Sequence, residues 1–334
     1  MRRVVGRART PSTLDGPGTV PAMRALLVVN HKATTTSGRV RDVLVQALRS
    51  VVNLEVEHTR QRGHAAGLAE QAAADGIDVV VALGGDGTVN EVVNGLLARG
   101  VPGHGPALAV VPGGSTNVFA RALGLPGDWV EATGVLLEAI REGRQRTIGL
   151  GRADDRFFTF CAGFGLDAEV IARVERARHR GGNHGSLLYL RALAGQYLLD
   201  TQRSAARITL ELDGEADENL ATVVVQNTSP WTYLGNRRID ACLEASFDTG
   251  LDVMGMRALR IPGTARTMTQ LLFPGGRRGR PGGPHGRRVL RLHDLAEFGL
   301  RANEPLAFQL DGDYLGAREK VRFTAVPSAL RVFC

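Results

Sequence analysis

One stretch of the sequence constrains the fold more than any other: a glycine turn that joins an apolar run to a helix pattern. The apolar run covers residues 77–83 with one interruption, Asp78, and Gly-Gly-Asp-Gly follows it at residues 84–87. Apolar residues then recur at helical spacing over residues 89–97, which predicts an amphipathic helix and leaves Asn90, Glu91 and Asn94 outside its buried face. Such a turn can hold a phosphate group, because glycines let the backbone approach the anion and the helix N–H groups point at it.

Strand and helix patterns alternate around this turn over about 125 residues, which is typical of a doubly wound, mostly parallel sheet. A second glycine turn, at residues 113–114, follows the apolar run 107–111. In an open α/β sheet, ligands bind at the carboxyl ends of the strands. We therefore expect both turns to meet there with Asn30 and Thr59, which end two further strands. No Gly-Lys-Ser or Gly-Lys-Thr sequence occurs, so the chain is not a P-loop protein.

The pattern changes after about residue 149 to short, strand-like segments, the first at residues 157–161, which predict an antiparallel β-sandwich. One helical stretch, residues 167–199, interrupts them, either as packed surface helices or as a flap over a cleft. The expected fold is α/β: a nucleotide-binding domain over residues 23–148 and a sandwich that binds the substrate over residues 149–334. We leave open that the last strand returns to the N-terminal domain. Residues 1–22 are expected to form a disordered basic tail, because no apolar stretch follows their arginines.

The charge of the chain points to an anionic partner. The net charge is +7, and Lys32 and Lys320 are the only lysines. A nucleotide, an acidic membrane surface or a nucleic acid would each suit this charge. The three cysteines fit neither a zinc site nor a disulfide framework, so a reducing, cytoplasmic location is expected. No run reaches the roughly 18 apolar residues that span a bilayer, so we expect membrane contact to be peripheral.

Residues 274–288 are rich in glycine, proline and arginine and cannot form a core. Most such runs are solvated loops. The alternative is that the arginines bind electrostatically to anionic lipid. No aromatic residues alternate with these arginines, so we do not expect a nucleic-acid partner.

Four sequence motifs resemble the diacylglycerol kinase catalytic-domain family, which includes bacterial lipid kinases and sphingosine kinases. They are GGDGTVNEVVNGL at 84–96, PGGSTNVFARALG at 112–124, QLDGD at 309–313, and Thr59 with the Gly-His-Ala sequence at 63–65. The resemblance implies that ATP binds between the two domains. It also implies that the γ-phosphate passes, with Mg²⁺, to the hydroxyl of a lipid substrate.

The resemblance also implies roles for individual residues. Asp313 would accept the proton of the lipid hydroxyl, and Asp248 with Leu251 would hold Mg²⁺. Asp86 would organise the phosphates and the metal, or else cap the helix that follows it. The residues expected to contact ATP are Asn30, Thr59, Gly84, Gly85, Asp86, Gly87, Thr88, Asn90, Gly114 and Ser115.

Three positions depart from the pattern of that family. Asp313 stands where the family has a glutamate, and Thr249 and Thr147 stand where aspartates are usual. These departures keep one alternative open, a nucleotide-binding protein that has lost phosphoryl transfer. A second alternative is an NAD kinase-like enzyme, because NAD kinases share the Gly-Gly-Asp-Gly turn on a similar two-domain plan. The leucines of residues 187–198 either line an acyl cleft or form ordinary core. The identity of the lipid and the formation of a homodimer are left open.

Overall fold

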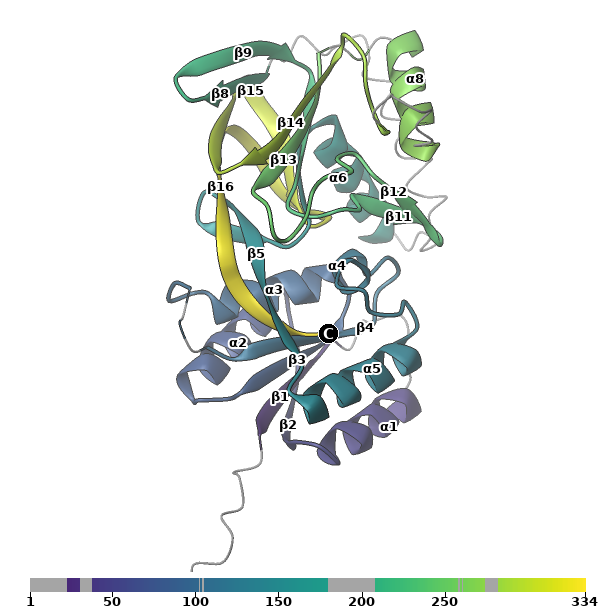
Figure 1. Cartoon of the computed structure of the whole chain (residues 1–334), viewed down its shortest axis with the longest axis vertical. Coiled ribbons are helices and arrows are strands. Elements are labelled where there is room, and N and C mark those ends of the chain that lie inside the picture. The colour runs from purple at the N-terminus through teal and green to yellow at the C-terminus, as the bar shows by residue number, and fades with distance from the viewer. Residues whose placement is uncertain are drawn as a thin grey trace, which may run out of the picture.

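The computed structural model describes residues 23–30, 38–101, 103, 105–179, 208–257, 259, 261–273 and 282–334. Figure 1 shows an α/β half below and a strand-rich half above, joined by two long strands. The predicted tail (1–22), most of the second part of the helical stretch (180–207) and the start of the arginine-rich run (274–281) lie outside the described residues. The predicted leucine stripe falls in the second of these ranges.

The lower half contains a parallel sheet in the order β4-β3-β1-β2. Its strands are β1 (Arg24–Val29), β2 (Asn53–His58), β3 (Val79–Gly84) and β4 (Ala107–Pro112). Residues on both faces of β3 are apolar and buried, as expected for a parallel strand covered by helices on both sides.

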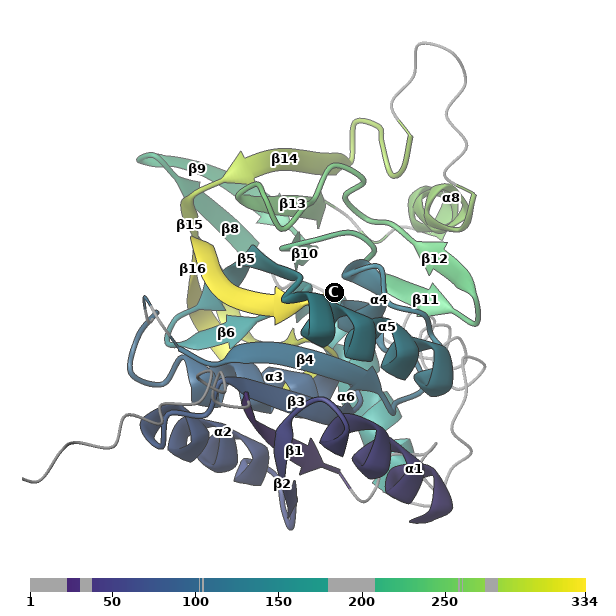
Figure 2. The same cartoon turned by 60° about the horizontal axis from the view of Figure 1, so that its bottom comes forward.

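Two pairs of helices cover the two faces of this parallel sheet (Figure 2). On one face, α1 (Gly38–Arg49) and α5 (Trp129–Glu142) share a core with alternate residues of β3, beginning at Val79. On the other face, α2 (His64–Ala74) and α3 (Asp86–Leu96) pack against the intervening residues, beginning at Val80. The short helix α4 (Val118–Ala122) follows the second glycine turn.

The upper half is a curved antiparallel region that surrounds one core, and a second core lies between this sheet and α8. Phe298 stacks on Phe323 there, with ring centroids 5.1 Å apart. Its strands are β5 (Gln145–Ala153), β6 (Arg156–Phe158), β7 (Cys161–Gly165), β8 (Ile208–Leu212), β9 (Glu215–Leu220), β10 (Thr222–Gln226), β13 (Leu251–Met256), β14 (Val289–Leu295), β15 (Glu297–Leu310) and β16 (Asp313–Phe333). The hairpin β11 (Thr232–Leu234) and β12 (Arg237–Ile239) and the helices α6 (Leu166–His179) and α8 (Ile261–Leu272) lie outside this sheet.

Within the described residues, the two halves share one continuous sheet of 14 strands. Strand β16 pairs with β15 and β5 in the upper half, and its Val332 then pairs in parallel with Leu108 of β4. The side chain of Phe333 is only 1% exposed and belongs to the core under α1 and α5. The last strand therefore returns to the N-terminal sheet, which the sequence had left open.

The predicted strand at 157–161 is wrong in one respect, because the chain turns at Thr159 and Phe160 between β6 and β7. The N–H groups of these two residues donate to the Asp311 carboxylate instead of to a neighbouring strand.

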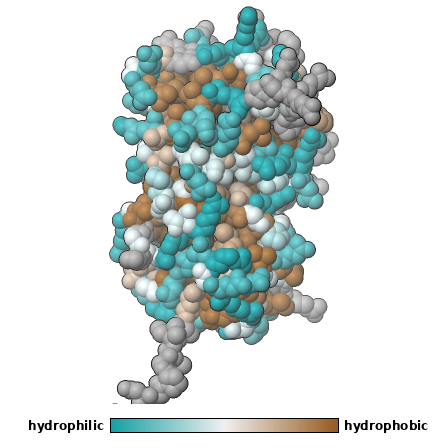
Figure 3. All heavy atoms as spheres, viewed as in Figure 1, coloured by the Kyte–Doolittle hydropathy of each residue, from teal (hydrophilic) through white to brown (hydrophobic). Residues whose placement is uncertain are grey.

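Polar and apolar patches alternate over the face in Figure 3. No helix among the described residues is both long and apolar enough to cross a membrane.

Candidate active site

The carboxyl ends of the parallel strands meet at one edge of the sheet, as the sequence predicts. The N–H of Asn30 donates to the Leu83 carbonyl at 3.0 Å, and the N–H of Thr59 donates to the Val29 carbonyl at 2.9 Å. Asn30 also donates from Nδ2 to Oγ1 of Thr88 at 2.8 Å, which ties it to the first turn of α3. Two of the expected ATP contacts are thus fixed beside the first glycine turn.

The two glycine turns lie against each other. A Cβ atom added to Gly114 would lie 2.7 Å from the Cα atom of Gly85, and one added to Gly84 would lie 2.6 Å from Thr88 Oγ1. A side chain at Gly114 would push the two turns apart, and one at Gly84 would clash with Thr88 of α3, so close packing requires glycine at both positions. Asn117 holds the second turn, since its Oδ1 accepts from Gly114 N at 2.8 Å and its Nδ2 donates to Gly114 O at 2.9 Å. Ser115 remains exposed at the tip.

Asp86 links the two turns. Its carboxylate accepts hydrogen bonds from the N–H groups of Val118 and Phe119, both at 3.1 Å, at the start of α4. The expectation that it caps the following helix, α3, is therefore wrong, because Gly85 is the N-cap of α3 and Asp86 serves the other turn. Burial raises the pKa of Asp86 to about 6, although these two hydrogen bonds oppose the shift. A role toward phosphate or metal stays a prediction.

Asn90 is buried, which corrects the expectation from helical spacing that it lies outside the buried face of α3, whereas its contact with ATP stays a prediction. It is 1% exposed, and its Nδ2 donates to the Phe157 carbonyl at 3.0 Å and to Asp311 Oδ2 at 2.8 Å. Its Oδ1 accepts from the Arg156 guanidinium at 2.7 Å. The face of α3 that is turned away from its own sheet is covered by β6, so the polar stripe of this helix is an interface between the two halves.

Asp311, which sequence reasoning did not single out, lies at the centre of this interface. It is 3% exposed and accepts from the Thr159 N–H at 2.7 Å, the Thr159 hydroxyl at 2.9 Å and the N–H groups of Phe160 and Cys161. Burial raises its pKa, whereas these hydrogen bonds and that from Asn90 lower it part of the way. The available signal was the Asp-Gly pair between two strand patterns, which is typical of a tight hairpin.

Asp313 lies directly over the first glycine turn. Asp311 and Gly312 form the hairpin between β15 and β16 with φ values of 50° and 82°, and Asp313 is the first residue of β16. A Cβ atom added to Gly87 would lie 3.3 Å from both carboxylate oxygens of Asp313. The side chain is 27% exposed, so it is accessible to a substrate. The structure thus places the predicted proton acceptor against the predicted phosphate turn.

Arg62, which no sequence motif indicated, forms an ion pair with Asp313 at 3.3 Å. It precedes α2, and Glu91 of α3 holds the same loop by accepting from the N–H groups of Gly63 and Ala65, at 2.8 and 3.1 Å. The α2 N-terminus therefore has its own carboxylate cap, while the guanidinium of Arg62 extends to the site. The site contains one cation and one carboxylate side by side.

The predicted magnesium ligands, Asp248 and Leu251, stay a prediction. Asp248 is 66% exposed and pairs with Arg146 at 2.6 Å, and Leu251 is a fully buried residue of β13 that can offer only its carbonyl group. Among the described residues, no three His, Cys, Asp or Glu side chains form a group that could hold a metal ion. We therefore assign no step of the chemistry to a metal held at this loop.

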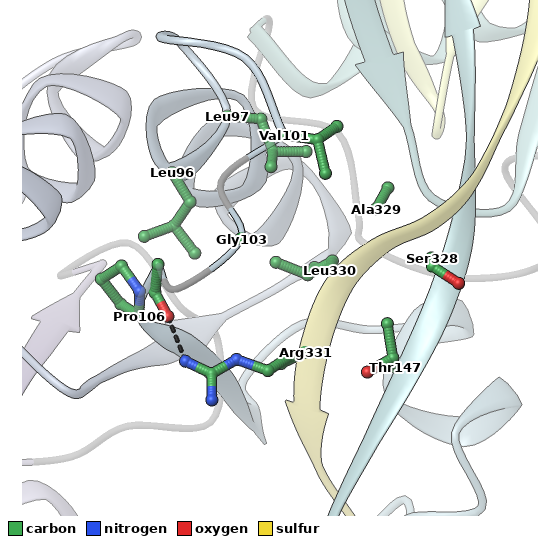
Figure 4. A pocket seen from close by; sticks show the side chains of 11 residues that line it. Leu96, Leu97, Val101, Gly103, Pro106, Thr147, Ser328, Ala329, Leu330 and Arg331 are labelled. Carbon is green, nitrogen blue, oxygen red and sulfur yellow. Dashed lines mark hydrogen bonds between the residues drawn. The ribbon is translucent and has the colours of Figure 1, made fainter.

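Thr147, the third departure, lies far from the glycine turns. It lines a cavity of about 240 Å³ with Leu96 and Leu97, which follow the α3 turn by some ten residues, and with residues 328–331 of β16 (Figure 4). Arg331 donates there to the carbonyl of Gly105. Because α3 starts at the carboxyl edge of the sheet, its end and this cavity lie at the opposite edge.

Comparison with known proteins shows which catalytic domain the N-terminal part of the chain resembles. Residues 24–153 match the family model of the diacylglycerol kinase catalytic domain. This part of the chain is therefore similar to that catalytic domain, in agreement with the motifs of the sequence.

Curated relatives named diacylglycerol kinase, from Staphylococcus aureus strains JH9 and Newman, are each 36% identical over 129 residues. The match spans 39% of this chain and 39% of the length of each relative. A solved diacylglycerol kinase structure from Bacillus anthracis str. Sterne superposes with a TM-score of 0.70 at 21% identity, over 94% of this chain and 98% of that one. This likeness confirms the predicted fold: a mostly parallel α/β part followed by an antiparallel one.

Proposed function

We propose that the chain is an ATP-dependent lipid kinase, which transfers the γ-phosphate of ATP to the hydroxyl of a lipid. The observation that carries the proposal is the position of Asp313, whose carboxylate oxygens lie at the glycine turn of α3. The catalytic-domain match over residues 24–153 supports the kinase class.

The glycine turns would bind the nucleotide. Phosphoryl transfer requires mainly that the protein position the reacting groups and neutralise their charge. The free N–H groups at the start of α3 and the absence of side chains at Gly84, Gly85 and Gly114 suit a phosphate chain. Asn30, Thr59, Thr88 and Ser115 lie around the same edge and could orient it.

Asp313 would act on the acceptor. A carboxylate within hydrogen-bond reach of the lipid hydroxyl takes its proton as the oxygen attacks the γ-phosphorus, and the bond from that phosphorus to the β,γ-bridging oxygen breaks. Arg62, which pairs with Asp313 in the structure, could bind phosphate oxygens once ATP is present. ATP supplies both the phosphoryl group and the leaving group, ADP, so no further reactant is needed.

Incubation with labelled ATP, Mg²⁺ and a total lipid extract tests the proposal, and the labelled lipid identifies the substrate class. We expect Asp313→Asn to reduce transfer by about 10²- to 10⁴-fold, the usual contribution of general-base catalysis. Asp313→Glu, which restores the carboxylate of the family, is expected to retain activity. The proposal would be contradicted if no lipid in any fraction gained label. Transfer of label to NAD in a parallel reaction would favour the NAD kinase alternative.

A nucleotide-binding protein without transfer activity is the second candidate. The observation that favours it is the commitment of Asp248 to Arg146, which leaves the predicted metal loop without a free carboxylate. Tight ATP binding together with no lipid labelling would support this candidate.

A further inference from the structure

A strongly basic surface adjoins the candidate site, and the proposed chemistry does not use it. It is formed by the β11–β12 hairpin, helix α8 and residues 282–288, which Figures 1 and 2 place on one side of the upper half. The sequence between Arg257 and Arg288 contains eight arginines and neither aspartate nor glutamate. No carboxylate within this stretch can neutralise its charge.

Helix α8 has one buried face and one exposed face. Leu271 is buried in a core with Met254 and Met256 of β13, whereas Ala265, Arg266 and Thr269 are exposed. Burial of the first face fixes the helix on the protein. The exposed face is thereby presented to the surroundings in a defined orientation.

A large aromatic side chain is exposed next to the arginines. Phe273 follows α8 directly and is 63% exposed, and the Arg237 guanidinium lies 4.4 Å from the centroid of its ring. Arg287 and Arg288 are exposed, and Arg288 lies beside Gly263 at the start of α8. Arg237, Arg266, Arg287 and Arg288 form no ion pair with any acidic residue among those the structure describes.

The basic surface is connected to the candidate site through α4. The Arg121 guanidinium of α4 stacks 3.3 Å from the centroid of the Tyr233 ring in β11, and it donates to the Gly235 carbonyl at 3.4 Å. The first two N–H groups of α4 donate hydrogen bonds to the carboxylate of Asp86, which follows the first glycine pair. A binding partner that contacts the β11–β12 hairpin and α8 would therefore lie close to the glycine turns.

We propose that Phe273 together with Arg237, Arg266, Arg287 and Arg288 forms a surface that docks the protein on an anionic lipid bilayer. Arginine guanidinium groups pair with lipid phosphates, and an aromatic ring enters the boundary between head groups and acyl chains. An exposed phenylalanine beside four arginines that form no ion pair with a described acidic residue combines both requirements. Docking as such does not depend on the proposed kinase activity, which would gain access to its lipid from it.

Co-sedimentation with vesicles, without ATP, tests the docking surface. Vesicles of phosphatidylcholine alone are compared with vesicles that also contain phosphatidylglycerol, at low and high salt. We expect binding only to the anionic vesicles, with an affinity that falls as salt rises. The triple variant Arg266→Gln/Arg287→Gln/Arg288→Gln is expected to bind about 100-fold more weakly, since each arginine near an anionic surface contributes about 1 kcal/mol and 1.4 kcal/mol is tenfold.

Two further variants separate docking from general charge and from misfolding. Phe273→Ser is expected to weaken vesicle binding about tenfold, since it removes an apolar group from the interface. Arg49→Gln/Arg141→Gln removes two exposed arginines from α1 and α5 in the lower half and should leave binding within about twofold. Thermal melts of all variants are expected to match the wild type, because the substituted side chains are exposed.

The proposal is overturned if the triple variant binds anionic vesicles as tightly as the wild type, or if phosphatidylcholine vesicles bind equally well. It is also overturned if single-stranded RNA, or inorganic phosphate at matched ionic strength, displaces the protein from vesicles completely. Those results would assign the surface to a nucleic acid or to a free anion. Absence of lipid phosphorylation alone leaves vesicle binding unaffected, so failure of the kinase proposal is distinguishable.

Discussion

Arg62 and Asp313 come from opposite ends of the sequence and meet at the first glycine turn. Arg62 is exposed and Asp313 is half-buried, so by itself their ion pair contributes little to stability. Its interest lies in its place, since one side chain can bind phosphate oxygens and the other can accept a proton. We expect ATP to compete with Asp313 for the guanidinium.

Replacement of Arg62 by glutamine is therefore expected to raise the KM for ATP by roughly tenfold. This corresponds to a loss of about 1.5 kcal/mol, the lower end of the range of free energies for one charge-assisted hydrogen bond. We expect kcat to change less than KM. Arg62→Lys should recover part of the affinity, because it keeps the charge but cannot bind two phosphate oxygens in the plane of a guanidinium. Steady-state kinetics over an ATP series measures both values, and an unchanged KM in Arg62→Gln would contradict the assigned role.

Asp86 makes the stability of the fold depend on pH. Because burial raises the pKa of this carboxyl from 3.8 to about 6, the folded state binds its proton more tightly than the unfolded state does. The contribution of Asp86 to the free energy of unfolding is therefore at its maximum below about pH 4. It falls as the pH rises to about 6 and stays lower above that pH. Asp86→Asn should remove the dependence and gain up to about 3 kcal/mol relative to wild type between pH 4 and pH 7.

Urea unfolding of both proteins at these two pH values measures the difference. Parallel changes in the free energy of unfolding would show that Asp86 does not titrate in this range. The asparagine side chain of the variant can still accept a hydrogen bond from one N–H group at the start of α4. The comparison therefore reports mainly the loss of the negative charge and less the loss of hydrogen bonds to α4.

At the scale of elements, helices α2 and α3 of the lower half approach each other closely. A Cβ atom added to Gly95 of α3 would lie 2.1 Å from the carbonyl oxygen of Ala66 in α2, so the two backbones are in direct contact. Helix α2, which is rich in alanine, permits this approach. The contact fixes α3 and therefore the position of the glycine turn at its start.

Gly95→Ala is expected to lower the free energy of unfolding by about 1–3 kcal/mol, because backbone atoms cannot move away as a side chain could. Gly67→Ala in α2 is the matched control, since nothing lies within 4 Å of the added Cβ atom. There the better helix propensity of alanine should raise stability by about 0.5–1 kcal/mol. Chemical denaturation of both variants checks the pair, and equal effects would contradict the packing argument.

The sequence predicted the elements that carry their own periodicity and missed those set by distant partners. The strand, turn and helix around Gly84 were predictable, since each has a local pattern. Strand β5 was not, because its polar first half is stabilised by β16, some 180 residues later. Asn90 was misplaced because helical spacing identifies the face toward the sheet but says nothing of the second layer, β6.

Site residues divide in the same way. Asp313 could be chosen from a motif, and the structure places it at the glycine turn. Arg62 could not be chosen, because its ion pair joins segments that are far apart in sequence. The Asp-Gly pair indicates a hairpin at Asp311 but not the convergence of distant N–H groups on its carboxylate. The roles of these residues in catalysis stay predictions.

For the molecule as a whole, the two halves are joined through β5 and β16 and share a sheet. Phe333 of β16 packs in the core of the lower half. We expect Phe333→Ala to reduce the free energy of unfolding by about 3–5 kcal/mol, as for other buried phenylalanines, although the residue is next to the end of the sequence.

The two tryptophans probe the lower half and the boundary between the halves, since Trp129 begins α5 and Trp231, which precedes β11, packs against a core of each half. Variants that keep only one of them, with phenylalanine at the other position, should report the same urea midpoint. The Phe333→Ala substitution should move both midpoints together, because a shared sheet makes unfolding cooperative. Separate midpoints would show that the halves unfold independently.

The return of β16 to β4 also determines when the lower half can complete its fold during synthesis. Strand β4 ends at Pro112, and the residues that pair with it and fill its core are made about 220 residues later. At ribosomal rates of about 5–20 residues per second, the edge of β4 stays open for roughly 10–45 s. The glycine turns therefore leave the ribosome before their sheet is closed, and a nascent chain in this state exposes a strand edge that chaperones would have to cover.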